Sequence, residues 1–89
     1  MRFEWDERKN KANIRKHGIS FEEASTVFDD FRLRTLPDPA HSERENRFLA
    51  IGLSFKFRLL LVCHCYRSGD IVRIFSARKP TRDEMKLYP

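Results

Sequence analysis

The chain has 89 residues, which is enough for one small domain, residues 1–89, and too few for two. Its 18 Lys and Arg residues outnumber its 13 Asp and Glu residues, and the net charge of +5 favours partners that carry phosphate. The longest apolar run, residues 59–63, is far too short to cross a membrane, and the N-terminus lacks the apolar segment of a signal peptide. We therefore expect a cytoplasmic protein with no membrane partner.

Helix-boundary residues predict the first elements. Residues 2–5 indicate a short extended segment. Asp6 is a suitable N-cap for a helix over residues 7–17, and Gly18 suits the left-handed conformation that often follows a helix end. The first helix therefore has a signal at each end.

A second helix is predicted directly after Ser20, which has the spacing of a capping box with Glu23. Its apolar residues recur at helical spacing, so one face should pack on the core. These residues are Phe21, Ala24, Val27 and Phe28. Residues 31–36 then alternate in the manner of a strand, and the loop over residues 37–46 supports no functional prediction.

From residue 47 the apolar period becomes two. Residues 47–54, 57–67 and 71–78 predict three strands joined by short turns, which is an antiparallel meander. The middle strand is apolar on both faces and should be central. A short C-terminal helix follows, with a capping box at Thr81 and Glu84. The order of elements predicts an α+β fold, with two N-terminal helices packed on a small antiparallel sheet.

Cys63 and Cys65 lie two residues apart on the middle strand, and His64 between them points to the opposite face. The three side chains cannot bind one metal ion together, and neighbours along one strand face rarely meet disulfide geometry. We expect two small buried residues with free thiols, no metal site and no cofactor.

The first helix carries one cationic face. Lys9, Asn13 and Lys16 lie within about 60° of one another around the helix axis, and His17 flanks them. This face is a candidate for contact with an anionic partner. The alternative is that the charges only solvate the helix.

A second cationic group follows the last strand. Arg78 leaves the sheet with Lys79 beside it, just before the N-terminus of the last helix, whose free N–H groups favour an anion. A salt bridge from Arg78 to Glu84, or to an acid of the second helix, is the structural alternative. Arg47 can join this group if its strand end lies nearby. Tyr88 shares a helix face with Glu84 and either contacts RNA or packs.

These residues resemble a known family, the BrnT toxins of bacterial type II toxin–antitoxin systems. The resemblance covers nearly the whole chain and is carried by two sets of residues in order. The first set is Trp5, Asp6, Lys9, Asn13, Lys16, His17, Gly18 and Phe21, and the second is Ser76, Ala77, Arg78, Glu84 and Tyr88.

The resemblance implies a fold similar to the RelE group and a ribonuclease that inhibits translation and growth. It also implies a BrnA-like antitoxin that masks the toxin, forms a heterotetramer with it and carries the domain that binds operator DNA. Both the toxin role and the partner come from the resemblance, whereas the fold class follows from the pattern of elements.

RNA cleavage through the 2′-OH requires a proton acceptor, cations for the charge that develops on phosphorus, and a donor for the departing oxygen, but no metal. Arg78 is the first candidate for the cation, because its planar fork can hold two phosphate oxygens. Lys9 and Lys16 would bind flanking phosphates or assist the leaving group. His17 and Glu84 are the candidate bases, although His17 also suits a helix C-terminus as a cap.

Two rival functions use the same cations. A non-catalytic nucleic-acid-binding domain would grip phosphate without turnover, and aromatic residues on an exposed sheet face would favour it. A protein-interaction module would present the basic face to an acidic partner. Few aromatic residues are predicted on an exposed sheet face, so the ribonuclease is the preferred hypothesis.

Overall fold

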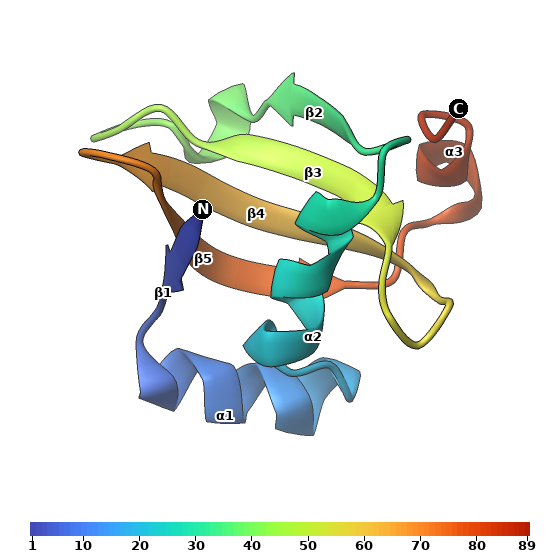
Figure 1. Ribbon diagram of the computed structural model, residues 1–89, viewed down its shortest axis with the longest axis horizontal. Coiled ribbons are helices and arrows are strands. Elements are labelled where there is room, and N and C mark those ends of the chain that lie inside the picture. Colours follow the sequence, from blue (N-terminus) through green and yellow to red (C-terminus); the bar gives the residue numbers. More distant parts are fainter.

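The computed structural model describes residues 1–89 as a five-stranded sheet with helices packed around it (Figure 1). The strands are β1 (Arg2–Glu4), β2 (Arg34–Pro37), β3 (Phe48–Leu53), β4 (Leu59–Arg67) and β5 (Ile71–Arg78). The helices are α1 (Glu7–His17), α2 (Phe21–Ser25) and α3 (Arg82–Met85), with two 3₁₀ turns, η1 (Thr26–Asp29) and η2 (Pro39–His41). None of the helices combines the length and the apolar character that crossing a bilayer requires.

The sheet has the strand order β1-β5-β4-β3-β2. The four strands from β2 to β5 pair antiparallel in sequence order, and only β1 pairs in parallel, with β5. β4 lies at the centre, as expected for a strand that is apolar on both faces. The predicted α+β class is therefore confirmed, including the meander, the two N-terminal helices and the short C-terminal helix.

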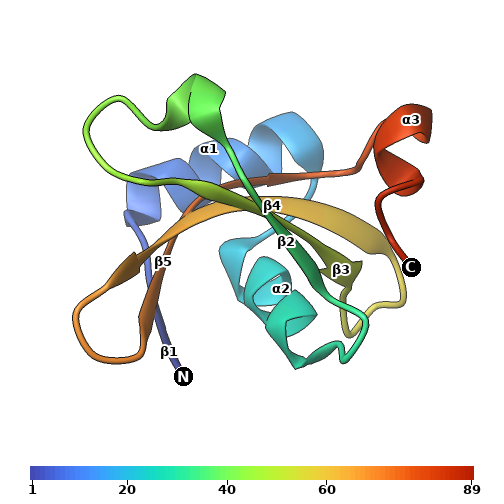
Figure 2. The ribbon, with the colours of Figure 1, turned by 90° about the horizontal axis from the view of Figure 1, so that it is seen from above.

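The hydrophobic core lies between the sheet and the helical segment α2–η1 (Figure 2). Gly52 allows η1 to approach β3 closely, because a Cβ at this position would lie 2.9 Å from Leu33 Cδ1 and 3.1 Å from Val27 Cβ. Burial of each large aliphatic side chain contributes roughly 1.5–3 kcal/mol. The core residues are Ile19, Phe21, Ala24, Val27, Ala50, Leu60, Val62, Val72, Ile74 and Ala77.

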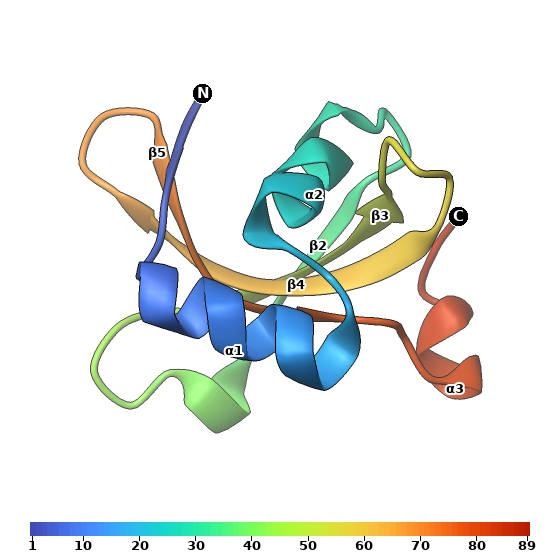
Figure 3. The same ribbon diagram turned by 90° about the horizontal axis from the view of Figure 1, so that it is seen from below.

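α1 packs beside β5, further along that strand than the three residues that pair with β1 (Figure 3). Asn13 makes this contact. Its Nδ2 donates to the carbonyls of Ala77 and Ile19, both at 2.8 Å, and its Oδ1 accepts from the N–H of Ala77 at 3.1 Å. The amide thus pairs with the backbone at the sheet edge as a neighbouring strand would. Asn13 was predicted on the cationic face of this helix as a candidate for contact with RNA; its side chain is buried, and its polar atoms are occupied by the backbone.

The predicted helix caps hold, with one exception. The Asp6 carboxylate accepts from the N–H groups of Arg8 and Lys9, and Gly18 follows α1 with a φ of 70°. Ser20 Oγ accepts from the N–H of Glu23 at 3.0 Å, but the Glu23 carboxylate does not return to Ser20. The second hydrogen bond of the predicted capping box is missing, because the Glu23 carboxylate is buried and accepts from Ser54 and Arg58 instead.

Glu23 joins α2 to the turn between β3 and β4. Its carboxylate accepts from Arg58 Nε and from Ser54 Oγ, each at 2.7 Å. The hydrogen bond from Arg58 is the main cause that lowers the Glu23 pKa, and burial opposes it. A buried carboxylate needs such partners to stay ionised.

The strand predicted over residues 31–36 begins later, at Arg34. Residues 31 and 32 form a turn, and Phe31 is almost fully exposed. The Asp30 carboxylate causes this shift, because it accepts from the N–H of Arg32 at 3.0 Å and from the N–H of Leu53 at 2.8 Å. An Asp side chain bonded to the backbone two residues on is typical of a turn.

Candidate active site

A groove lies on the sheet face opposite the core. Its floor is a row of residues paired across three strands, in which Cys63 of β4 is opposite Leu49 of β3 and Ser76 of β5. The next residues along these strands, including Val62 and Ala77, belong to the core, and alternate residues of a strand face opposite sides. The groove has a volume of about 380 Å³, within the range of ligand-binding clefts.

A β-bulge shapes the groove at β5. The pairing shifts between Cys63 and His64, whose partners are Ser76 and Ile74, so that Phe75 has no partner on β4. Phe75 and Ser76 both line the groove. Bulges often redirect side chains near functional sites, and this one adds an aromatic ring to the floor.

Three cations from distant parts of the chain line the groove. Lys9 comes from α1, Arg47 from the residue before β3, and Arg78 from the end of β5. Arg47 Cζ lies 3.7 Å from the centroid of the Phe75 ring, and Lys9 Nζ lies 5.5 Å from it. Cations over an aromatic face are attracted to it, so Phe75 helps to hold both in place. The structure thus brings together three of the predicted site residues.

Arg78 also forms a forked ion pair with Glu84. Its two terminal nitrogens donate to the two carboxylate oxygens at 2.7 and 2.9 Å. This is the salt bridge that the sequence offered as the alternative to an anion site at Arg78. Glu84 also accepts from the N–H of Thr81 at 2.8 Å in the predicted capping box, which is fully formed. The hydrogen bond from Arg78 is the main cause that lowers the Glu84 pKa to about 2. So weak a proton acceptor is poorly suited to the role of base predicted for Glu84.

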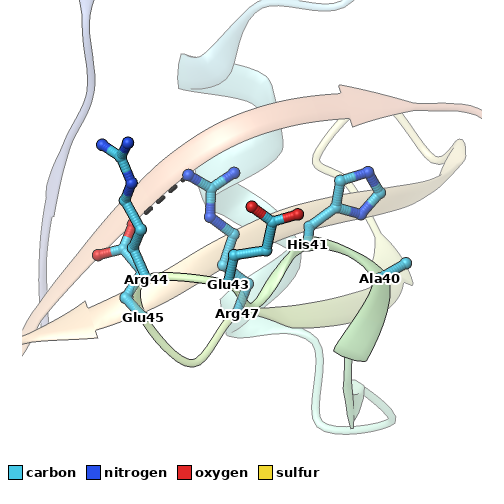
Figure 4. Close-up of a pocket in the computed structure, with 6 residues that line it drawn as sticks. All are labelled: Ala40, His41, Glu43, Arg44, Glu45 and Arg47. Atoms are coloured by element: carbon cyan, nitrogen blue, oxygen red, sulfur yellow. Dashed lines mark hydrogen bonds and ion pairs between the residues drawn. The ribbon is translucent and has the colours of Figure 1, made fainter.

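A second hollow adjoins the groove at the hairpin loop between β2 and β3 and shares His41 and Arg47 with it (Figure 4). In this view, Arg47 and His41 project from the same side of the loop. Glu45 lies 3.5 Å from an Arg47 terminal nitrogen and 2.8 Å from one of Arg67. Arg47 Nε is buried without a hydrogen-bond partner.

The other predicted site residues lie outside the groove. Lys16 and Lys79 are exposed and form no side-chain hydrogen bond or ion pair, and His17, which is half-buried, forms none either. The Tyr88 hydroxyl donates to Asp30 Oδ2 at 2.6 Å. This hydrogen bond is the main cause that raises the Tyr88 pKa, and it engages the phenol with the residue that follows η1.

Three residues that line the groove were not predicted from the sequence, namely Asp38, His41 and Phe75. His41 Nδ1 lies 2.8 Å from Asp38 Oδ2, and the Cys63 thiol donates to the same oxygen at 3.8 Å. Burial, with the Asp38 charge second, raises the Cys63 pKa to about 11, so this thiol stays protonated. A signal was present, because Asp38 is followed by a proline suited to the first position of a helical turn and by His41 three residues on.

Both cysteines are buried and free, as predicted. The structure contains no group of three or more His, Cys, Asp or Glu side chains arranged to hold a metal ion.

Residues 5–84 match the family model of the ribonuclease toxin BrnT of type II toxin–antitoxin systems. The chain belongs to the BrnT family. The matched residues include the groove from Lys9 to Arg78, and the match confirms the resemblance seen in the sequence. No curated protein sequence matches the chain.

The fold is similar to the crystal structure, at 1.1 Å resolution, of the Brucella abortus ribonuclease toxin BrnT. The TM-score is 0.71 at 24% sequence identity, and the likeness spans 92% of this chain and 99% of that one. At this identity the similarity shows the fold, and it confirms the predicted arrangement of a BrnT-family toxin.

Proposed function

We propose that residues 1–89 act as one toxin domain that cleaves RNA in the cytoplasm without a metal ion and so inhibits translation and growth. The convergence of Lys9, Arg47 and Arg78 on one groove is the observation that carries this proposal. The three cations come from separate parts of the chain, and Lys9 and Arg47 both lie over the ring of Phe75 on the groove floor. Family membership supplies the ribonuclease class.

The chemistry of the groove supports phosphodiester cleavage. Attack of the RNA 2′-OH on phosphorus places additional negative charge on the phosphoryl oxygens, and fixed cations stabilise that charge. Arg78 is held by Glu84, and Arg47 by Phe75, so neither guanidinium has to be ordered when RNA binds. Lys9 adds a third charge at the α1 side of the groove.

We further propose that the toxin is neutralised by a BrnA-like antitoxin. Membership of a type II family implies a protein partner. The complex would be a heterotetramer in which the antitoxin carries the domain that binds operator DNA. A groove that presents several cations is a suitable target for an acidic segment of such an inhibitor.

The test is cleavage of a defined single-stranded RNA by the wild type and by Arg78→Ala, in EDTA, with and without ribosomes. We expect wild-type products with 2′,3′-cyclic phosphate ends. Loss of a charge-stabilising donor typically costs about 10²- to 10³-fold in rate, and we expect this loss for Arg78→Ala. Arg82→Ala is the matched control, because Arg82 is a nearby exposed cation that does not line the groove.

The outcomes separate the rival functions. RNA that is bound in a salt-dependent manner but never cut, even with ribosomes, would indicate a non-catalytic binding domain. Activity that EDTA abolishes and a divalent metal restores would contradict the metal-independent mechanism. In cells, Arg78→Ala should abolish growth arrest while antitoxin binding remains detectable. Loss of both together with an unfolded circular dichroism spectrum would make Arg78 structural.

A further inference from the structure

A carboxylate and an imidazole form a positioned pair at the edge of the groove. The side chain of Asp38 is only 8% exposed, whereas that of His41 is 66% exposed. A carboxylate can only accept, so His41 Nδ1–H donates to Asp38 Oδ2 across 2.8 Å. In the neutral ring the second nitrogen, Nε2, carries the lone pair, and it forms no hydrogen bond with the chain.

The backbone of the hairpin loop holds Asp38 in place. The N–H of Asp38 donates to the carbonyl of Arg47 at 2.8 Å, which closes the loop between β2 and β3. Ser42 Oγ donates to the carbonyl of Asp38 at 2.5 Å and accepts from the N–H of Arg47 at 3.0 Å. His41 therefore belongs to a tied turn whose other end carries one of the groove cations.

The surroundings of His41 are strongly charged. The cations lining the groove and the adjoining hollow are Lys9 of α1, Arg44 and Arg47 of the loop, and Arg78 of β5. The acidic and thiol groups are Asp38, Glu43 and Glu45 of the loop, and Cys63 of β4. The cations would hold a phosphate next to the imidazole of His41, which is a side chain able to accept a proton.

We propose that His41 is the general base of RNA cleavage and that Asp38 is its positioning residue. This inference rests on the proposed function. His41 Nε2 takes the proton of the 2′-OH as the 2′-oxygen bonds to phosphorus. The bond from phosphorus to the 5′-oxygen breaks with its electron pair, and that oxygen takes a proton from solvent. The imidazolium then returns its proton to water, and the products are a 2′,3′-cyclic phosphate and a 5′-hydroxyl.

The geometry favours His41 over His17 and Glu84, the two candidate bases predicted from the sequence. His17 does not line the groove, and the carboxylate of Glu84 is engaged by Arg78 and by the N–H of Thr81. His41 combines an exposed ring with a buried carboxylate partner, and such a carboxylate orients the catalytic imidazole in serine hydrolases. The three cations of the groove lie nearby.

The test measures the rate of RNA cleavage against pH for the wild type, His41→Ala and Asp38→Asn. We expect the wild-type pH–rate profile to have a limb in which the rate rises between pH 5 and 8. We expect His41→Ala to lower the rate by roughly 10²- to 10⁴-fold and to remove this limb. Asp38→Asn should lower the rate at least about tenfold, because an amide donor favours the imidazole tautomer with Nε2 protonated. Added imidazole should partly restore His41→Ala, since the site is open to solvent. Thermal unfolding of each variant checks that it is folded.

Each result bears on a different claim. If His41→Ala keeps the wild-type rate and limb while Arg78→Ala is inactive, His41 is not the base, although the proposed ribonuclease stands. If His17→Ala loses the limb and His41→Ala keeps it, the base is His17. A low rate in His41→Ala with an unchanged limb and no response to imidazole would make the role of His41 structural. If the wild type cuts no RNA, with or without ribosomes, the proposed function fails and His41 loses its role with it.

Discussion

Asn13 fills a position at the edge of β5 that a further strand would otherwise take. Its amide bonds both the N–H and the carbonyl of Ala77, and it also bonds the carbonyl of Ile19. Asn13→Ala leaves these buried groups unpaired, and each such group costs about 1–3 kcal/mol. We expect the free energy of unfolding to fall by at least about 2 kcal/mol, measured by urea denaturation, because more than one group is orphaned.

Lys16→Ala is the control for this prediction, since Lys16 lies one turn along the same helix and is exposed. Exposed substitutions usually change stability by less than about 0.5 kcal/mol. If Asn13→Ala were as stable as the wild type but bound RNA less tightly, the original assignment of Asn13 to the RNA-binding face would be correct.

The roles of single residues were predictable where their partners are near in sequence. Asp6, Gly18 and Thr81 act within one helical turn, so cap preferences were enough to assign them. Asn13 bonds a residue 64 positions away, and Glu23 bonds one 35 positions away. A local sequence pattern cannot predict partners so far away in the chain. The sequence therefore predicted a surface position for Asn13 and a helix cap for Glu23.

At the scale of elements, α3 is anchored through Glu84, which serves the helix N-terminus and Arg78 at once. The folded pKa of Glu84 is about 2, below its ordinary value of 4.5. Between these values the unfolded carboxyl is protonated while the folded one stays ionised. The stabilisation is therefore present above about pH 5 and is lost as pH falls towards 2.

Glu84→Gln tests this dependence. We expect it to lower the free energy of unfolding at pH 7 by roughly 1 kcal/mol, a value discounted for the partial exposure of the pair, and the difference should shrink as pH falls. Urea unfolding at pH 7, 5 and 3 measures it. Asp83→Asn, which changes the adjacent and largely exposed carboxylate, should have a smaller effect. A constant difference at every pH would mean that the charge of Glu84 contributes nothing.

The elements of the sheet were predictable because strands of the meander alternate and their turns are short, whereas the loop at residues 37–46 has no period. That loop nevertheless delivers His41 to the groove and leads directly into Arg47, which also lines it. Its conformation is set by Asp38 and Ser42, which bond backbone groups across the hairpin. The bulge that exposes Phe75 depends on the pairing of β4 with β5, which the sequence of either strand leaves undetermined.

At the scale of the whole molecule, three of the 18 Lys and Arg residues meet at the groove from distant parts of the chain. If Lys9, Arg47 and Arg78 each neutralise a phosphate, the logarithm of the RNA binding constant should fall with the logarithm of salt concentration with a slope near −2, at about −0.7 per contact. Arg47→Ala should make the slope shallower by roughly 0.7. A 2′-O-methyl RNA, which lacks the attacking hydroxyl, allows binding to be measured without cleavage.

Arg2→Ala removes one charge from the same total but from the other end of β5. Arg2 pairs with Ile71 at the start of β5 and lies 3.9 Å from Asp70, whereas Arg78 ends the strand. Because counterions are released only where phosphate binds, Arg2→Ala should leave the slope unchanged. If the slope became shallower by the same amount in both variants, RNA binding would depend on the overall charge of the molecule. A shallower slope in Arg47→Ala alone would place the bound phosphates in the groove, beside the imidazole of His41.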